Sequence, residues 1–596
     1  MRLQLLSAAL GFVLSGALCE AAVAPPSEWG VAVLEVGWSP DARHEQLALR
    51  GCLELMGIPF LATTNVEEAA RYPLVLTGGI LQNTQLSPAQ REALYAYVER
   101  GGVLLSSQVQ GNQFFPLFGL AHAASRRTNF RVSFASWDEP ALRYLNRPEE
   151  RTVSLGDPKL YSETIWSTEY TPSSKTKVLA RYANGAAALT VNAYGRGSAY
   201  ALGLGFKETT LLPQLADSFE AARRWINGFE PSGDVFRLLL RGLYEANVHP
   251  FVLIHTVPEG KDTAVCLSHD VDAQPSFRNS LSFAQMEKAM GVRSTFFVTT
   301  KFFTDSADIG YYSPDRLGWI RQVKDLGFEV ASHSVSHSLA FEEFPVGSPG
   351  LVPESYDPGH PTIFGEALVS KELLDRDLNQ RTAGFRAGYL RYPSELLRVL
   401  EESGYSFDSS VSAQWVLTNF PYFGFRQRSV GSERSKIVVV PVTLDDSRGE
   451  TQTHDFLTAE TTEEALRIWT EVVRANAENN GTTCLLIHPT DATYKLETER
   501  RFIETIRGDN TWIGDVGTMA RFWHQRALLR PQLRFTSGGS VEIVLNLKRS
   551  ELPPGQSLVL EVRGSEPAPP VRDVAGEMIP VRMRTAEDKL VMLLLP

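Results

Sequence analysis

Short apolar runs that suit buried strands alternate with helix signals, and this alternation constrains the fold more than any other feature of the sequence. Residues 31–36 predict a strand, 45–56 a helix and 58–61 the next strand, and the pattern continues to about residue 105. Strands that alternate with helices form parallel sheets with helices covering their faces. The sequence therefore predicts an α/β protein.

Size and composition bound the class of protein. The chain has 596 residues, which at roughly 150 residues per domain allows about three or four domains. Its 58 Lys and Arg against 69 Asp and Glu give a net charge of −11, so no basic field is present to hold nucleic acid or an anionic membrane. With 43% apolar and 21% charged residues, the chain is expected to be globular, not disordered, collagen-like or a polytopic membrane protein.

The N-terminus predicts an export signal. Arg2 precedes an apolar run at 3–18, and small residues follow at 21–24. The run ends at Glu20 and is shorter than the roughly 18–20 apolar residues that a membrane anchor needs. We expect residues 1–24 to be a signal peptide and the protein to be exported, periplasmic or secreted, with no transmembrane segment.

Two polar motifs follow apolar strands in the middle of the chain. The strand predicted at 263–267 leads to Asp270 and Asp272, two carboxylates that can share a pocket with a cation. A second strand leads to His333 and His337, which at this spacing would lie on one face of a helical turn and bind one metal ion. Each motif alone also suits a structural role. Together, one carboxylate and two histidines leave positions open for water and substrate, as in a catalytic metal site.

Two further pieces complete a recognisable set. Arg386 lies in the segment 383–390, and His488 ends the apolar strand predicted at 483–487. In this order the pieces resemble the NodB-homology polysaccharide deacetylases of carbohydrate esterase family 4. The resemblance extends over about 263–523, includes the strand at 294–298, and implies a distorted (β/α) barrel with its site at the carboxyl ends of the strands.

The resemblance implies a role for each matching residue and a divalent metal cofactor, zinc first. The implied roles are catalytic base for Asp270, metal ligands for Asp272, His333 and His337, orientation of the base for Arg386, an oxyanion-binding backbone N–H for Tyr389, and general acid for His488.

Three departures from the family pattern stand out. Val271 separates two aspartates that are adjacent in the commonest family motif, and Gly388 stands where a proline is usual. No Asp-Trp pair follows Asp408, so the carboxylate that orients His488 is left open, with Asp408 as a candidate.

The rest of the chain suggests two more modules. Residues 28–230 resemble the flavodoxin-like, glutamine-amidotransferase-like α/β domains, but their one cysteine, Cys52, has an inward helical spacing that predicts packing rather than catalysis. Residues 250–528 form the expected deacetylase domain, and 530–596 predict a small antiparallel β-domain. Cys266 and Cys484 are expected to be buried free thiols, with a disulfide possible only if their strands are neighbours.

Aromatic residues on two long insertions are candidate substrate contacts. Tyr356 lies in the insertion 341–364, and Trp415 and Tyr422 lie in 415–425. Such side chains can stack on sugar rings or pack the loops onto the barrel, and the sequence does not separate these alternatives.

These observations predict an exported, metal-dependent deacetylase of an N-acetylhexosamine polymer, an exopolysaccharide first and peptidoglycan second. The module order resembles that of Pel-type exopolysaccharide-modifying proteins, which implies association with an exopolysaccharide machinery. Two alternatives stay open: a hydrolase of a small amide or cyclic imide, and a non-catalytic carbohydrate-binding scaffold. No nucleic-acid partner is expected.

Overall fold

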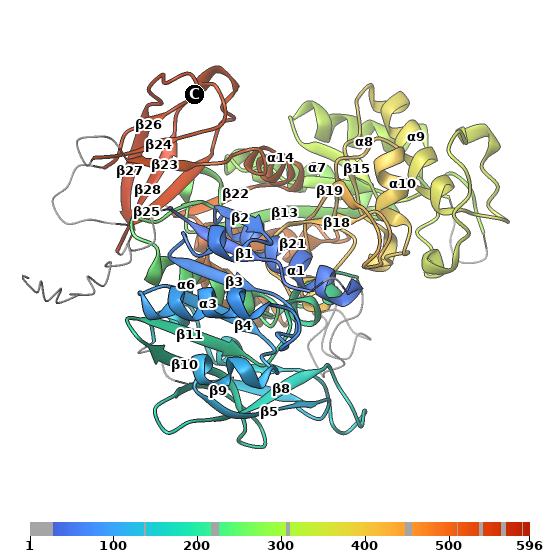
Figure 1. Cartoon of the computed structure of the whole chain (residues 1–596). Coiled ribbons are helices and arrows are strands. Elements are labelled where there is room, and N and C mark those ends of the chain that lie inside the picture. Colours follow the sequence, from blue (N-terminus) through green and yellow to red (C-terminus); the bar gives the residue numbers. More distant parts are fainter. Residues whose placement is uncertain are drawn as a thin grey trace, which may run out of the picture.

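In the computed structural model the chain is a mixed α/β protein with two large sheets and two small ones (Figure 1). The structure describes residues 28–37, 39–135, 139–215, 226–305, 310–447, 456–508, 510–535, 540–561, 568–586 and 588–596. The predicted signal peptide at 1–24 lies outside these residues. Within them, no helix combines the length and the apolar character needed to cross a bilayer.

Parallel strands form one half of the first sheet, as the alternation predicts. Their order is β2 (Phe60–Thr63), β1 (Val31–Leu34), β3 (Leu74–Thr77), β4 (Val103–Ser107) and β11 (Gly197–Leu202). Helices α1 (Pro40–Met56) and α3 (Pro88–Glu99) connect these strands. α1 begins where the Ser39 side chain accepts the Ala42 N–H and ends at Gly57, whose φ of 71° suits glycine.

The other half of the first sheet is antiparallel. It continues from β11 through β10 (Ala187–Tyr194), β9 (Lys177–Tyr182), β6 (Arg131–Phe134) and β7 (Thr152–Ser154), while β8 (Ser167–Pro172) and β5 (Leu120–Arg126) attach through β10. The resemblance of this region to glutamine-amidotransferase-like domains stays a prediction.

The second large sheet is curled into a half-barrel. Its order is β18 (Tyr422–Phe425), β19 (Arg434–Val439), β17 (Phe407–Asp408), β16 (Gly384–Phe385), β15 (Glu329–Ser332), β14 (Thr295–Val298), β13 (Thr263–Val271), β21 (Thr482–Ile487) and β20 (Leu444–Asp445), and β22 (Thr511–Asp515) also pairs with β13. All pairs are parallel except β18 with β19. The Val442 N–H donates to Val411 O and the Thr443 N–H to Cys484 O, so one segment joins the two sides of the curl.

Helices cover the outside of the half-barrel and bury its strands. They are α7 (Gln274–Ala289), α8 (Pro314–Asp325), α9 (Ser370–Leu378), α10 (Leu396–Glu402), α12 (Thr462–Asn479), α13 (Tyr494–Ile506) and α14 (Val516–Arg526). Every residue of the central strand β13 is buried, as expected for a strand covered on both faces.

The C-terminal part forms two small sheets. One has the antiparallel order β12 (Val252–Ile254), β25 (Ser557–Glu561), β28 (Lys589–Leu594) and β27 (Val581–Ala586), and the other consists of β23 (Gln532–Phe535), β24 (Val541–Val544) and β26 (Val571–Arg572). The four-stranded sheet differs from the expected C-terminal domain at 530–596, because it includes β12. This strand follows α6 (Asp234–Asn247) and precedes the half-barrel in sequence. In sequence β12 falls within the expected deacetylase domain at 250–528, and in the structure it pairs with β25 of the C-terminal part.

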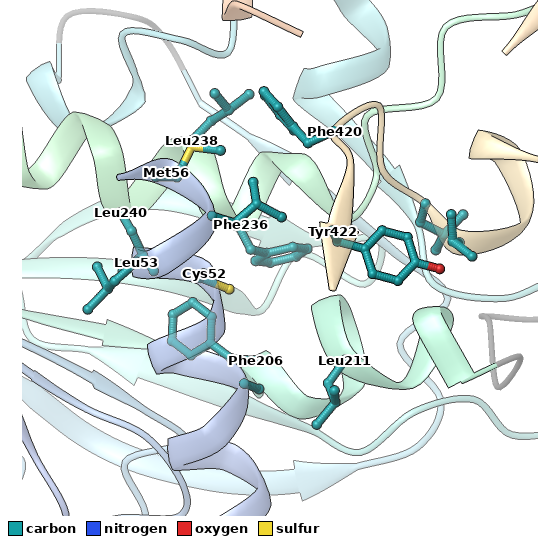
Figure 2. Close-up of a cluster of buried hydrophobic side chains, with 14 of the residues drawn as sticks. Cys52, Leu53, Met56, Phe206, Leu211, Phe236, Leu238, Leu240, Phe420 and Tyr422 are labelled. Carbon is teal, nitrogen blue, oxygen red and sulfur yellow. The ribbon is translucent and has the colours of Figure 1, made fainter. Parts of the chain in front are cut away.

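The three described cysteines are buried free thiols, as predicted. Cys52 lies on the inner face of α1, among apolar side chains that include Leu53 and Phe236 (Figure 2). Cys266 and Cys484 are direct register partners on the neighbouring strands β13 and β21, yet no disulfide joins them.

Candidate active site

Five of the predicted site residues lie at or just beyond the carboxyl ends of parallel strands. Asp270 is the penultimate residue of β13 and Asp272 lies just beyond that strand. His333 follows β15, Arg386 follows β16, and His488 follows β21. Carboxyl ends of parallel strands meet at one edge of a sheet, so the fold brings these side chains together although more than 200 residues separate the first from the last.

Asp272, His333 and His337 offer a three-ligand metal site. Their candidate ligand atoms all lie within 4.8 Å of one another, and Asp272 Oδ2 is 3.6 Å from His337 Nε2. His333 Nδ1 lies 2.8 Å from the carbonyl oxygen of Arg386, which accepts its proton and leaves Nε2 as the ligand atom. One carboxylate and two imidazoles, one of them oriented in this way, fit a divalent metal ion with positions left for water and substrate.

The His333–His337 segment is not the helical turn that the spacing predicts. Ser334 and His337 have φ values of 63° and 53°, so the chain reverses locally after β15 and brings the two imidazoles together through a loop. The buried carboxylate of Glu366 holds this loop, because its Oε2 accepts the N–H groups of Val335 at 2.9 Å and Ser336 at 2.8 Å.

Tyr356 supports this loop from the insertion. Its hydroxyl donates to Glu366 Oε1 at 2.5 Å, and its ring stacks on Phe303 with centroids 5.7 Å apart. Tyr356, a candidate substrate contact, therefore packs against the loop from His333 to His337 and supports it. Packing of the insertion onto the barrel was the second of the two alternatives that the sequence left open.

Arg386 fixes the orientation of Asp270. The guanidinium is fully buried, and its Nη1 donates to Asp270 Oδ1 at 2.7 Å. Its Nη2 donates to the hydroxyls of Ser268 at 3.0 Å and Ser409 at 2.9 Å, so the guanidinium has little freedom to rotate. Burial alone would raise the pKa of Asp270, but the adjacent Arg386 guanidinium outweighs it and holds that pKa below its ordinary value. Asp270 is therefore an ionised carboxylate that can accept a proton.

His488 pairs with Asp446, a residue that the sequence reading missed. His488 Nδ1 lies 2.7 Å from Asp446 Oδ1, and Lys495 Nζ lies 2.7 Å from Asp446 Oδ2. Burial lowers the pKa of His488, but the Asp446 carboxylate outweighs it and raises that pKa to about 10. His488 Nε2 faces Asp272 Oδ2 at 3.6 Å, so a protonated imidazole lies beside the candidate metal site.

Asp408, the candidate partner for His488, is a wrong prediction. Its carboxylate accepts the hydroxyl and the N–H of Ser410, and burial raises its pKa to about 7. The sequence did carry a signal for Asp446, since Asp446 directly follows the short strand β20, which pairs with β21 shortly before His488.

Tyr389 and Gly388 lie against the candidate metal ligands. Tyr389 has a φ of 55°, and its ring centroid is 4.5 Å from that of His337. A Cβ atom on Gly388 would lie 2.6 Å from His337 Cδ2, so the proline usual in the family would collide with this imidazole. The oxyanion role of the Tyr389 N–H stays a prediction.

Replacing Gly388 by alanine is expected to lower metal affinity by roughly 10- to 100-fold, because the new Cβ must displace a ligand imidazole. Competition with a chromophoric chelator measures the affinity. Gly318→Ala is the matched control, since no atom lies within 4 Å of the added Cβ. Equal affinities of the two variants would show that His337 is not a ligand.

The two remaining aromatic candidates differ in exposure. Trp415 lies on the short helix α11 (Ala413–Val416) and is 36% exposed. Tyr422 is 3% exposed and belongs to the core between β18 and α6, where Figure 2 shows it near Phe236. Its ring is not available to stack on a sugar, so that prediction is wrong.

A second group of possible ligands is better explained as a proton-sharing network. His269 of β13, Glu287 of α7 and Glu499 of α13 are buried together. His269 Nε2 lies 3.1 Å from Glu287 Oε1. Unlike His333, His269 has no hydrogen-bond partner at its other ring nitrogen, whereas metal-bound histidines normally have one. Burial and the neighbouring Glu287 carboxylate raise the pKa of Glu499 well above its ordinary value. A protonated Glu499 beside Glu287 therefore accounts for the cluster.

Comparison with known proteins gives matches to solved structures at low identity and over part of the chain. No protein-family model and no curated protein matches the chain. Among solved structures, a protein from Mycobacterium smegmatis assigned as a polysaccharide deacetylase is 21% identical, covers 45% of this chain and 91% of its own, and has a TM-score of 0.34. A family 4 acetyl xylan esterase from Clostridium thermocellum, solved with a cobalt ion, is 15% identical, covers 44% and 91%, and has a TM-score of 0.26.

One of the matched solved structures is that of a pseudoenzyme. A pseudoenzyme of carbohydrate esterase family 4 from Bacillus anthracis is 13% identical, covers 45% of this chain and 68% of its own, and has a TM-score of 0.28. Low identity and partial coverage therefore leave the function to be inferred from the side chains of the site itself.

Proposed function

We propose that this protein is a metal-dependent deacetylase that removes N-acetyl groups from an N-acetylhexosamine polymer. One observation supports this proposal above the others. A carboxylate base held by a buried arginine and a protonated histidine held by a carboxylate both border a three-ligand metal site. Amide hydrolysis needs these three parts, since a water must lose a proton, the carbonyl must be polarised and the departing amine must gain a proton.

The roles of the side chains follow from their positions. A divalent metal held by Asp272, His333 and His337 would polarise the acyl carbonyl and acidify a water molecule. Asp270, ionised and fixed by Arg386, takes the proton of the attacking water. His488 donates its Nε2 proton to the leaving nitrogen, while Asp446 holds the ring by its Nδ1.

The substrate and setting of the proposal rest on the sequence. The signal peptide predicted at 1–24 supports an exported protein, periplasmic or secreted, and the module order supports an exopolysaccharide, handled with its export machinery, before peptidoglycan. Zinc is the metal we propose, since carboxylate and imidazole ligands with open positions suit it. Deacetylation would turn neutral amides into ammonium groups and give the polymer a positive charge.

A substrate panel tests the proposal. Purified protein loaded with zinc is incubated with oligomers of N-acetylglucosamine and of N-acetylgalactosamine, with peptidoglycan, and with a small cyclic imide, and acetate or ring opening is measured. We expect acetate release from at least one hexosamine oligomer. Activity restricted to the imide would replace the polymer with a small-molecule substrate, and inactivity on every substrate with metal bound would contradict the proposal.

A further inference from the structure

A cleft lies apart from the candidate metal ligands. Its lining comes from three parts of the chain: α1 with β2, β18 with β19, and α14 with the segment after it. It has a volume of about 1310 Å³ and is lined chiefly by residues 47–62, 422–436 and 523–533. Residues of β2 and β18, edge strands of the two large sheets, both contribute to its lining. None of Asp272, His333 and His337 lines it.

The charge of this cleft is opposite to that of the chain. The protein carries a net charge of −11, yet the cleft is lined by six arginine or lysine side chains and two glutamates. Three of the cations have carboxylate partners; they are Arg50, Arg237 and Arg434. Within the part of the chain that the structure describes, no carboxylate forms an ion pair with Lys436, Arg526 or Arg530. The cleft therefore holds positive charge that the protein does not neutralise.

Arg526 is the deepest of these cations. It is 3% exposed, and it donates only to backbone carbonyl oxygens, the nearest being His255 O at 2.8 Å. Its Cζ lies 4.7 Å from the ring centroid of Trp523. Burial, followed by repulsion from Arg530 and Arg241, lowers the pKa of Arg526 to about 9. A buried cation without a counter-charge is unfavourable, and an anion in the cleft would relieve that cost.

Two buried polar groups of the lining also lack partners. Among the residues that the structure describes, none forms a hydrogen bond with the Tyr422 hydroxyl or the Trp523 Nε1–H, although the two residues are only 3% and 2% exposed. In Figure 2 the Tyr422 hydroxyl lies at the end of the ring that points away from Phe236. Both residues line the cleft, so these two donors lie near any group that enters its wall.

Apolar side chains form the rest of the walls. Leu47 and Leu55 contribute from α1, Phe60 contributes from β2, and Phe423 contributes from β18. The Phe423 ring lies between His524, at a centroid distance of 5.4 Å, and Arg434, whose Cζ is 5.4 Å from its centroid. A flat apolar group fits such walls better than a small hydrated ion does.

We propose that this cleft binds an organic anion that has a flat apolar body. The unneutralised cations would bind its charge, the unpaired donors would bind its acceptor atoms, and the aromatic and aliphatic walls would cover its body. The site goes beyond the proposed deacetylase activity and does not depend on it. It would give residues 47–62, which run from α1 to β2, a binding role.

An aromatic sulfonate tests the site. The full chain is titrated with 8-anilinonaphthalene-1-sulfonate by calorimetry and by fluorescence energy transfer from tryptophan. We expect saturable binding at one site, at least about tenfold tighter than that of the uncharged N-phenyl-1-naphthylamine, because charge contributes to the affinity. Non-saturable binding, or equal affinity for the two compounds, would overturn the proposal.

A pair of matched double variants locates the bound probe. Arg530→Gln with Lys436→Gln should weaken binding of the sulfonate by about tenfold, because two unpaired cations are lost. Arg181→Gln with Lys177→Gln removes the same charge from the exposed antiparallel end of the first sheet and should leave the affinity unchanged. Equal effects of the two double variants would show that the probe responds to net charge alone, and that would overturn the proposed site.

Discussion

Replacing Asp270 by asparagine is expected to lower the rate of amide hydrolysis by roughly 100- to 10 000-fold, the usual contribution of a general base. The asparagine oxygen can still accept from Arg386 Nη1, so the local structure should persist. Only the ability to take a proton is lost. The bound metal should stay, because Asp272, His333 and His337 are unchanged. Steady-state acetate release and metal content of the same preparation provide the measurement.

The metal content decides how a loss of activity in this variant is interpreted. An inactive Asp270→Asn protein that has also lost its metal would make Asp270 a ligand rather than the base. A variant with wild-type activity and full metal loading would contradict the assigned mechanism.

Asp446→Asn is the second large effect, with an expected loss of roughly 100- to 10 000-fold in amide hydrolysis. Asp446 accepts from His488 Nδ1 and so fixes both its tautomer and its charge. An asparagine can present an N–H to the same nitrogen, which leaves a neutral imidazole with its one proton on Nε2. That N–H is a far weaker acid than the one of the imidazolium, so it donates poorly to the leaving nitrogen. Asp445→Asn is the matched control, because the Asp445 side chain accepts from Ser447 instead of His488.

Substrates with different leaving groups show whether Asp446 acts through proton donation by His488 or only stabilises the structure of the site. On 4-nitrophenyl acetate, whose leaving group needs no proton, Asp446→Asn should lose less than about tenfold, whereas Asp270→Asn should lose activity on the ester and the amide alike. Equal losses of Asp446→Asn on both substrates would mean that the variant disturbs the site as a whole.

The sequence was sufficient to predict the residues that follow clear apolar strands. Asp270, His333 and His488 each come at the end of a buried parallel strand, and such ends converge whatever the details of the loops. The parallel half of the first sheet was predictable for the same reason, since its strands are short apolar runs separated by helices.

Other features depend on contacts that local pattern does not carry. The loop from His333 to His337 takes positive φ values because Glu366, about 30 residues later, binds its N–H groups. Asp446 was missed because β20 spans two residues and gives little strand signal, whereas Asp408 follows a more evident motif. Tyr422 resembles a loop aromatic in sequence, but it lies on an edge strand that packs against α6.

The most direct test of the account measures bound metal and released acetate on one preparation. Metal-free wild type, Asp272→Ala and Glu499→Gln are each titrated with zinc and assayed on an N-acetylhexosamine oligomer. We expect a single metal per chain and acetate release proportional to loading for wild type and for Glu499→Gln, because burial and Glu287 raise the pKa of the Glu499 carboxyl well above its ordinary value and Glu499 does not belong to this site. Asp272→Ala should show neither. Acetate release by metal-free wild type, or by Asp272→Ala, would contradict the assignment of this site as a catalytic metal centre.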